Sequence, residues 1–160
     1  MILQRPHLPT LFAGLAFTLS VAAHAQTAPQ AVVKAFMDGF NSGNLAKSAA
    51  LNSASGTSII ERFAPYTWTG TGAFDHWSAD YDSNAKANGI TDGKVTLSAP
   101  LVQSVTETQA YLIYPSLYLY KQKGTPMREP GRVAMVLRKE GSDWKIAAWT
   151  WTGTVPTRAK

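Results

Sequence analysis

The chain has 160 residues, with 15 Lys and Arg against 10 Asp and Glu, a net charge of +5, and no cysteine. This length predicts a single hydrophobic core, and the lack of cysteine excludes disulfides, thiolate metal ligands and a lipid-modified cysteine. The positive charge is modest and no recognised nucleic-acid-binding motif accompanies it, so we expect no nucleic-acid partner.

The first 25 residues have the layout of a secretory signal peptide. Arg5 precedes an apolar run over 11–23, and the small residues Ala23 and Ala25 form a cleavage signal. The run is shorter than the roughly 20 residues of a membrane-spanning helix, so we expect no stable membrane insertion. We expect a signal peptide at 1–25, one domain at 26–160, and export to the periplasm or the cell exterior. The absence of cysteine favours a bacterial periplasm.

Two amphipathic helices are expected in the first half of the domain. In PQAVVKAFMDGFNSGN, from Pro29, apolar residues recur at helical spacing, and a short helical piece over 45–51 follows. After a β-branched extended segment over 57–63, a second clear helix runs over 73–88, with an apolar face at Phe74, Trp77 and Tyr81 and a stop at Gly89.

The second half of the chain predicts strands joined by turns. Alternating side chains and turn clusters indicate strands over 94–105, 109–121, 131–139 and 144–152. Helices followed by antiparallel strands predict an α+β domain whose helices pack on one face of a curved sheet.

The order of these elements resembles the nuclear transport factor 2-like, or SnoaL-like, superfamily over about 30–153. The likeness includes FAPYTW after the first helices, the helix that contains Trp77, and the closing hairpin RVAMVLRK with GSDWKI. It implies a cone-shaped fold in which a strongly curved antiparallel sheet wraps around three N-terminal helices and leaves a pocket at its wide end. The superfamily includes steroid isomerases, polyketide cyclases, dehydratases and binding domains, and many members dimerise through the outer sheet face. The resemblance therefore implies a homodimer without fixing the function.

Residue types and motifs argue against a metal or a cofactor. After the signal peptide the only histidine is His76, so a histidine-rich zinc site is excluded, and no calcium-loop spacing is present. The sequence also contains no nucleophile elbow, phosphate-binding loop or dinucleotide glycine fingerprint. We expect no metal and no cofactor.

The best acid/base candidates are His76 and Asp80, which lie four residues apart on one helix face. In a pocket they would move a proton next to a carbonyl group, with the carboxylate orienting the imidazole. The alternative is a surface pair that only supports the helix. Steroid isomerases use a tyrosine and two aspartates, and the strand region 111–120 has no acid to supply that trio.

Aromatic residues are the other prominent feature. Apolar walls with a few phenols and indoles suit a planar hydrophobic ligand, although the same rings can simply fill the core. The candidate pocket residues are Phe36, Phe40, Trp68, Trp77, Tyr81, Tyr114, Tyr118 and Trp149.

Three functions remain open from the sequence. The first is an exported, dimeric domain that binds a small hydrophobic molecule in the pocket between the helices and the sheet. The second is an isomerase, cyclase or dehydratase with His76 and Asp80 as acid and base. The third is a dimeric interaction module that works through the outer face of the sheet.

Overall fold

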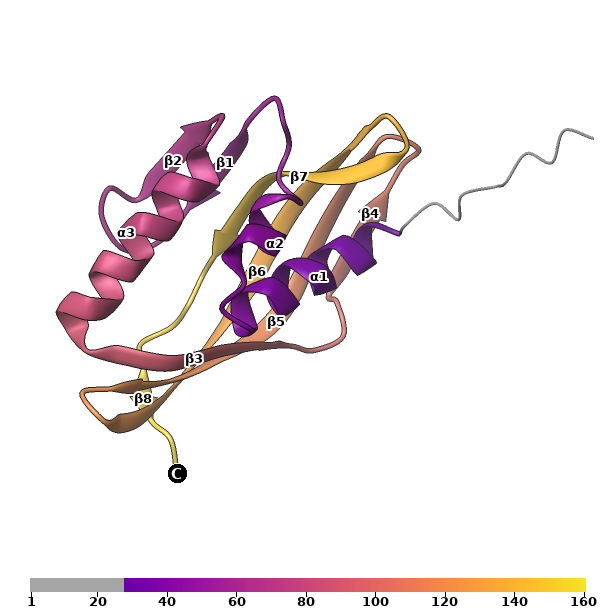
Figure 1. Cartoon of the computed structure of the whole chain (residues 1–160). Coiled ribbons are helices and arrows are strands. Elements are labelled where there is room, and N and C mark those ends of the chain that lie inside the picture. Colours follow the sequence, from indigo (N-terminus) through magenta and orange to yellow (C-terminus); the bar gives the residue numbers. More distant parts are fainter. Residues whose placement is uncertain (1–27) are drawn as a thin grey trace, which may run out of the picture.

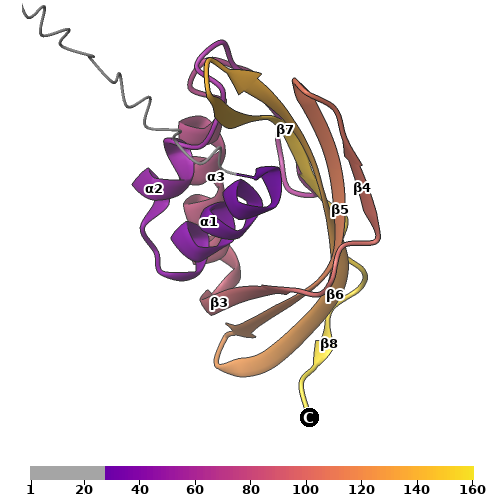
Figure 2. The ribbon, with the colours of Figure 1, turned by 90° about the vertical axis from the view of Figure 1, so that its right-hand side faces the viewer.

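The computed structural model describes residues 28–160, so the predicted signal peptide lies outside the described residues. The described chain is an α+β domain in which helices cover the concave face of a strongly curved sheet (Figures 1 and 2). This is the cone-like fold class that the sequence predicts. None of the helices in 28–160 combines the length and apolar character needed to cross a bilayer.

The helices begin and end at residues whose chemistry explains their limits. Helix α1 (Pro29–Asn41) starts with proline in its first turn and buries Val33 and Phe36. Helix α2 (Leu45–Ala49) is capped by Asn44, whose side chain accepts a hydrogen bond from the backbone N–H of Lys47. Helix α3 (Ala73–Asn88) ends at Gly89, which has a left-handed backbone with φ of 65°.

The strands form one sheet in the order β2-β1-β7-β6-β5-β3, with β4 paired to β5 and β8 paired to β6. The described pairs are antiparallel apart from β1 with β7, which is parallel. The strands are β1 (Thr57–Ile60), β2 (Thr67–Gly70), β3 (Ile90–Leu97), β4 (Val102–Val105), β5 (Gln109–Gln122), β6 (Thr125–Glu140), β7 (Asp143–Trp151) and β8 (Thr157–Arg158).

Two of the predicted extended segments end differently in the structure. The strand expected over 94–105 is two strands, β3 and β4, separated by a segment that contains Pro100, which has no N–H to donate to a strand ladder. The extended segment expected over 57–63 leaves the sheet after Ile60, and residues 61–63 turn inward toward α3. This early exit carries the Glu61 carboxyl toward the interior and leaves the next residue, Arg62, half-exposed.

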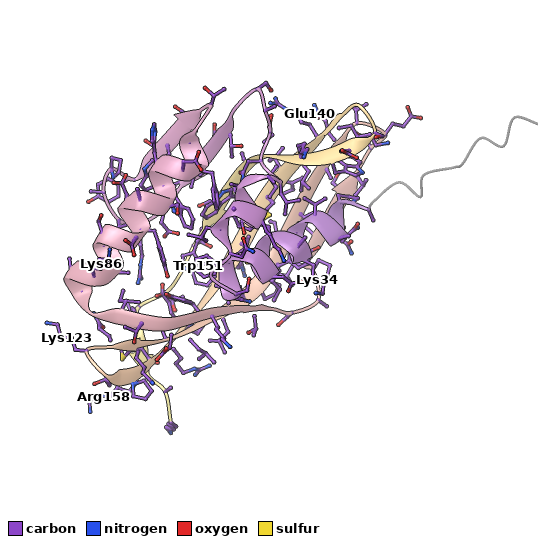
Figure 3. The ribbon with its side chains drawn as sticks, in the orientation of Figure 1. Lys34, Lys86, Lys123, Glu140, Trp151 and Arg158 are labelled. Carbon is purple, nitrogen blue, oxygen red and sulfur yellow. The ribbon has the colours of Figure 1, made fainter. Side chains whose placement is uncertain are left out.

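The core lies between the helices and the concave face of the sheet. On β5 the side chains of Ala110, Leu112 and Tyr114 are buried, whereas Tyr111 is 42 % exposed on the other face. Figure 3 shows side chains of the two layers meeting between α3, α1 and the strands. The fully buried apolar side chains of this core are Val33, Ile59, Leu112, Val133, Met135, Leu137 and Ile146.

Candidate functional site

A cavity of about 90 Å³ lies between α1, α3 and the concave face of the sheet. Its lining comes from α1, the segment after β1, α3 and strands β3, β5, β6 and β7. The lining residues are Phe36, Met37, Phe40, Glu61, Arg62, Phe63, Trp77, Tyr81, Asn84, Ile90, Val95, Tyr118, Glu129, Val133, Trp149 and Trp151.

Aromatic rings form most of the cavity wall. Trp77 stacks on Tyr81, one turn further along α3, with ring centres 5.4 Å apart and planes 26° apart. Trp149 of β7 meets Trp77 edge to face at 4.8 Å, and Phe40 of α1 meets Tyr81 at 5.5 Å. The Nε1 groups of Trp77 and Trp149 are buried without a hydrogen-bond partner among residues 28–160. The wall is therefore apolar, with two indole N–H groups that the described protein leaves unpaired.

Two tyrosine hydroxyls meet at the cavity. The hydroxyl groups of Tyr81 on α3 and Tyr118 on β5 are 2.7 Å apart, so one donates a hydrogen bond to the other. Gly93 makes room for this contact, because a Cβ atom at that position would lie 2.5 Å from the Tyr118 hydroxyl. Burial raises the pKa of both hydroxyls, so both stay protonated at neutral pH. The phenol that accepts this bond keeps an O–H available for another partner.

An ion pair between a buried carboxylate and a half-exposed arginine lies beside these phenols. The Arg62 guanidinium meets both carboxylate oxygens of Glu129, with Nη1 to Oε1 at 2.7 Å and Nη2 to Oε2 at 2.8 Å. The Glu129 side chain is 1 % exposed, whereas that of Arg62 is 48 % exposed. Burial raises the pKa of the Glu129 carboxyl, and Arg62 opposes the rise. Arg62 thus compensates a carboxylate that the sheet would otherwise bury alone.

Glu61 is the unpaired acid of the site. Its Oε1 accepts a hydrogen bond from the backbone N–H of Arg62 at 2.9 Å. Among residues 28–160 no basic side chain forms an ion pair with it. Burial raises the pKa of Glu61 from 4.5 to about 7, more than the neighbouring Arg62 lowers it, and the charge of Glu129 raises it further. This carboxyl can gain or lose a proton near neutral pH.

Six of the eight candidate pocket residues line the cavity, and two lie elsewhere. Trp68 packs against Phe63, with ring centres 5.2 Å apart, and its Nε1 donates to Asp80 Oδ2 at 2.8 Å. Tyr114 borders a separate hollow between α1 and the β3–β4 edge. The cavity-lining candidates are Phe36, Phe40, Trp77, Tyr81, Tyr118 and Trp149.

The structure does not bring His76 and Asp80 together at the cavity. Helix α3 turns Trp77, Tyr81 and Asn84 toward the interior, which leaves His76 on its exposed side. Asp80 is half-buried and accepts the hydrogen bond from Trp68, and no hydrogen bond between Asp80 and His76 is present in the described chain. Neither side chain lines the cavity.

Sequence reasoning missed the charged residues of the site, although two signals point to them. Glu61 and Arg62 directly follow the half-buried strand Thr57–Ile60, and the loops that follow strands often carry functional side chains. Glu129 has the same parity on β6 as the buried Val133, Met135 and Leu137, which predicts that it faces the interior. Within 28–160 no three His, Asp or Glu side chains are grouped as metal ligands.

Comparisons with known proteins agree with this architecture. A model of the SnoaL-like domain matches residues 30–151, whereas no curated protein matches the chain. A candidate scytalone dehydratase from Novosphingobium aromaticivorans is 14 % identical, with a TM-score of 0.63 over 82 % of this chain and 85 % of that one. A ketosteroid isomerase-like protein from Erwinia carotovora is also 14 % identical, with a TM-score of 0.61 over 79 % and 94 %.

A nuclear transport factor 2-like protein from Salmonella enterica is 15 % identical, with a TM-score of 0.64 over 78 % of this chain and 87 % of that one. Identities this low show a shared fold and nothing about the reaction or the ligand. The family model spans most of the described residues and includes every strand that contributes to the cavity. The resemblance seen in the sequence is confirmed: the chain shares its fold with the nuclear transport factor 2-like protein, and it belongs to the SnoaL-like domain family.

Proposed function

We propose that the domain binds a small, largely apolar molecule in the cavity between α1, α3 and the sheet. The observation that carries this proposal is an interior space walled by aromatic rings, with polar groups gathered around Glu61 and the Tyr81–Tyr118 pair. Ligand sites commonly combine such an apolar wall with a few polar groups that orient the ligand.

The size of the cavity limits what is buried in it. An engineered apolar cavity of about 150 Å³ holds one benzene molecule, and the present cavity of about 90 Å³ is smaller. It therefore takes one compact group of a ligand. The half-exposed Arg62 marks where the lining reaches the surface, so the rest of the ligand extends in that direction.

A ligand that binds only the folded state raises its stability, so thermal-shift screening of the purified protein against small apolar compounds tests the proposal. We expect at least one compound to raise the melting temperature and to change tryptophan fluorescence, because Trp77 and Trp149 line the cavity. Trp77→Phe should weaken both responses. The matched control is Trp144→Phe, a buried tryptophan outside the cavity lining. The proposal fails if no compound shifts the melting temperature.

A second candidate is an enzyme that transfers a proton, of the isomerase or dehydratase type, with Glu61 as the base. Glu61 has a pKa of about 7 at the cavity, and the nearby phenols can donate a hydrogen bond to a developing negative charge. The exposed position of His76 favours Glu61 over the His76–Asp80 pair. Deuterium incorporation from D₂O into small ketones would reveal this activity. Glu61→Gln should abolish it and His76→Ala should not.

Export and dimerisation complete the proposal. The leader-like sequence at 1–25 supports export, and N-terminal sequencing of the mature protein should then begin at Gln26. A start at residue 1 would contradict export. The convex face of the sheet carries exposed apolar side chains, including Tyr111 and Val136, which support a homodimer formed through that face.

A further inference from the structure

Resting on the proposed ligand-binding function, we infer that the ligand carries a positive charge: the geometry points to an alkylammonium or quaternary ammonium group held between the Glu61 carboxylate and the aromatic wall. The inference follows from the pairing of charges around the cavity, the faces of the rings, and the size of the space.

Three charged side chains lie among the lining residues, and two of them neutralise each other. The Arg62 guanidinium makes contacts of 2.7 and 2.8 Å with the two oxygens of the buried Glu129 carboxylate. Glu61 receives only the backbone N–H of Arg62, and within 28–160 it has no ion-pair partner. When all three are ionised, the lining carries one uncompensated negative charge, at Glu61. A cationic ligand supplies the missing countercharge. An anionic ligand is repelled by Glu61, and Arg62 is already paired with Glu129.

The aromatic wall favours the same class of ligand. Ring faces attract cations, and clusters of aromatic rings bind quaternary ammonium groups in this way. Trp77, Tyr81 and Phe40 form a continuous group of rings, with centre-to-centre distances of 5.4 to 6.4 Å. Phe63 extends the group at 6.2 Å from Tyr81, directly after Arg62 in the chain. The cation that the described protein places over a ring is Lys139, over Trp144, which is outside the cavity lining.

The neighbours of Glu61 determine how binding depends on pH. The charged and titratable residues that line the cavity with Glu61 are Arg62, Glu129, Tyr81 and Tyr118. Burial keeps both phenols protonated, and Glu129 is held by Arg62. Glu61 therefore changes charge with a pKa of about 7 in the free protein. A bound cation stabilises the carboxylate, so affinity should be full above pH 7 and should decline as the pH falls below it.

The test compares choline with its uncharged isostere 3,3-dimethylbutan-1-ol, by isothermal titration calorimetry of the purified protein at pH 6 and pH 8. The two probes have the same shape, and the compact trimethylammonium head suits the small cavity. We expect choline to bind at least tenfold more tightly than the alcohol at pH 8. We also expect its affinity to fall about tenfold at pH 6, where most Glu61 is protonated.

Glu61→Gln should remove both the preference for choline and the effect of pH. The matched control is Glu107→Gln, an exposed glutamate outside the cavity lining, which should change neither. The pH dependence of the unmodified protein tests the inference even if the Gln variant fails to fold.

Two results overturn the inference and leave the proposed function standing. One is an isostere that binds as tightly as choline, and the other is a cavity that binds neutral apolar compounds and not choline. If neither probe nor any compound of the apolar panel binds, the proposed function and the inference fail together.

Discussion

Burial of the Glu61 carboxylate lowers the stability of the folded protein. Its pKa is 4.5 ordinarily and about 7 after burial, so the folded state binds the proton more tightly than the unfolded state. Well below pH 4.5 the carboxyl is protonated in both states, and its burial costs no charge penalty. The free energy of unfolding declines as the pH rises from 4.5 through 7, and it stays at the lower value above that. A shift of this size corresponds to a penalty of up to about 3 kcal/mol, less in practice because the side chain is only partly buried.

Glu61→Gln should therefore stabilise the protein at high pH. The amide oxygen can keep the hydrogen bond from the Arg62 backbone N–H, and the buried charge is removed. We expect a gain of about 1–3 kcal/mol in the free energy of unfolding at pH 8 and almost none at pH 4.5. Urea titrations at the two pH values measure it, with Glu107→Gln as the exposed control. A loss of stability at pH 8 would show that the carboxylate is well compensated within the protein.

The Arg62–Glu129 pair should behave in the opposite way. Arg62→Gln leaves the buried Glu129 carboxylate without its countercharge, which we expect to cost about 2–3 kcal/mol at pH 8 given that Arg62 is half-exposed. The loss should shrink at pH 5, because burial raises the pKa of Glu129 and its protonation removes the stranded charge. The double variant Arg62→Gln/Glu129→Gln should recover most of the loss in urea unfolding. A double variant as unstable as the single one would show that packing, not charge, causes the effect.

At the scale of elements, one side chain fastens α1 to the sheet edge that borders the cavity. The Asn41 side chain donates to the Val95 carbonyl and accepts from the Val95 N–H, both at 2.7 Å. These bonds satisfy both backbone groups of Val95 on β3, just beyond the irregularity between Thr91 and Lys94. The cavity wall formed by Phe40 and Val95 depends on this attachment.

Asn41→Ala should leave both Val95 groups without partners and cost about 2–3 kcal/mol in the free energy of unfolding. Amide hydrogen exchange should also become faster at Val95. The matched control is Asn88→Ala, because Asn88 is exposed and bonds only within α3, to Asn84. Equal losses in the two variants would contradict the role given to Asn41.

The sequence predicts these elements well wherever periodicity decides the outcome. α1 and α3 carry apolar stripes that only a helix can bury on one side, and β5 alternates so strictly that Leu112 and Tyr111 are assigned to opposite faces. The short strand β2 was missed, because its Thr-Trp-Thr-Gly sequence is strand only through pairing with β1.

The polar part of the cavity was harder to predict for a related reason. A Glu-Arg dipeptide in a sequence normally indicates a solvated turn. Here Arg62 binds Glu129, 67 residues away in the chain, and the neighbouring Glu61 lies in the cavity lining. Helical spacing pairs His76 with Asp80, but spacing alone does not determine which side of α3 the sheet covers. Long-range packing decided both cases.

At the scale of the whole molecule, the helices of residues 28–160 cover one face of the sheet and leave the other face uncovered (Figure 2). The strand register aligns side chains of that convex face in rows, with Tyr111 opposite Val136 and Val136 opposite Ala148. Tyr111 is 42 % exposed and Val136 is 38 % exposed, so the centre of the face offers apolar area to a partner. A second copy of the chain would cover it with a complementary surface.

We expect the purified protein to sediment as a dimer and Tyr111→Glu to convert it to a monomer, because paired copies would bury two new carboxylates at the centre of the contact. The domain itself should stay folded, since the side chain of Tyr111 lies outside the core. Val155→Glu is the matched control, because Val155 is more exposed, at 82 %, and belongs to none of the strands. Circular dichroism of each variant separates dissociation from unfolding. A protein that sediments as a monomer before any substitution would show that the convex face serves another partner or none.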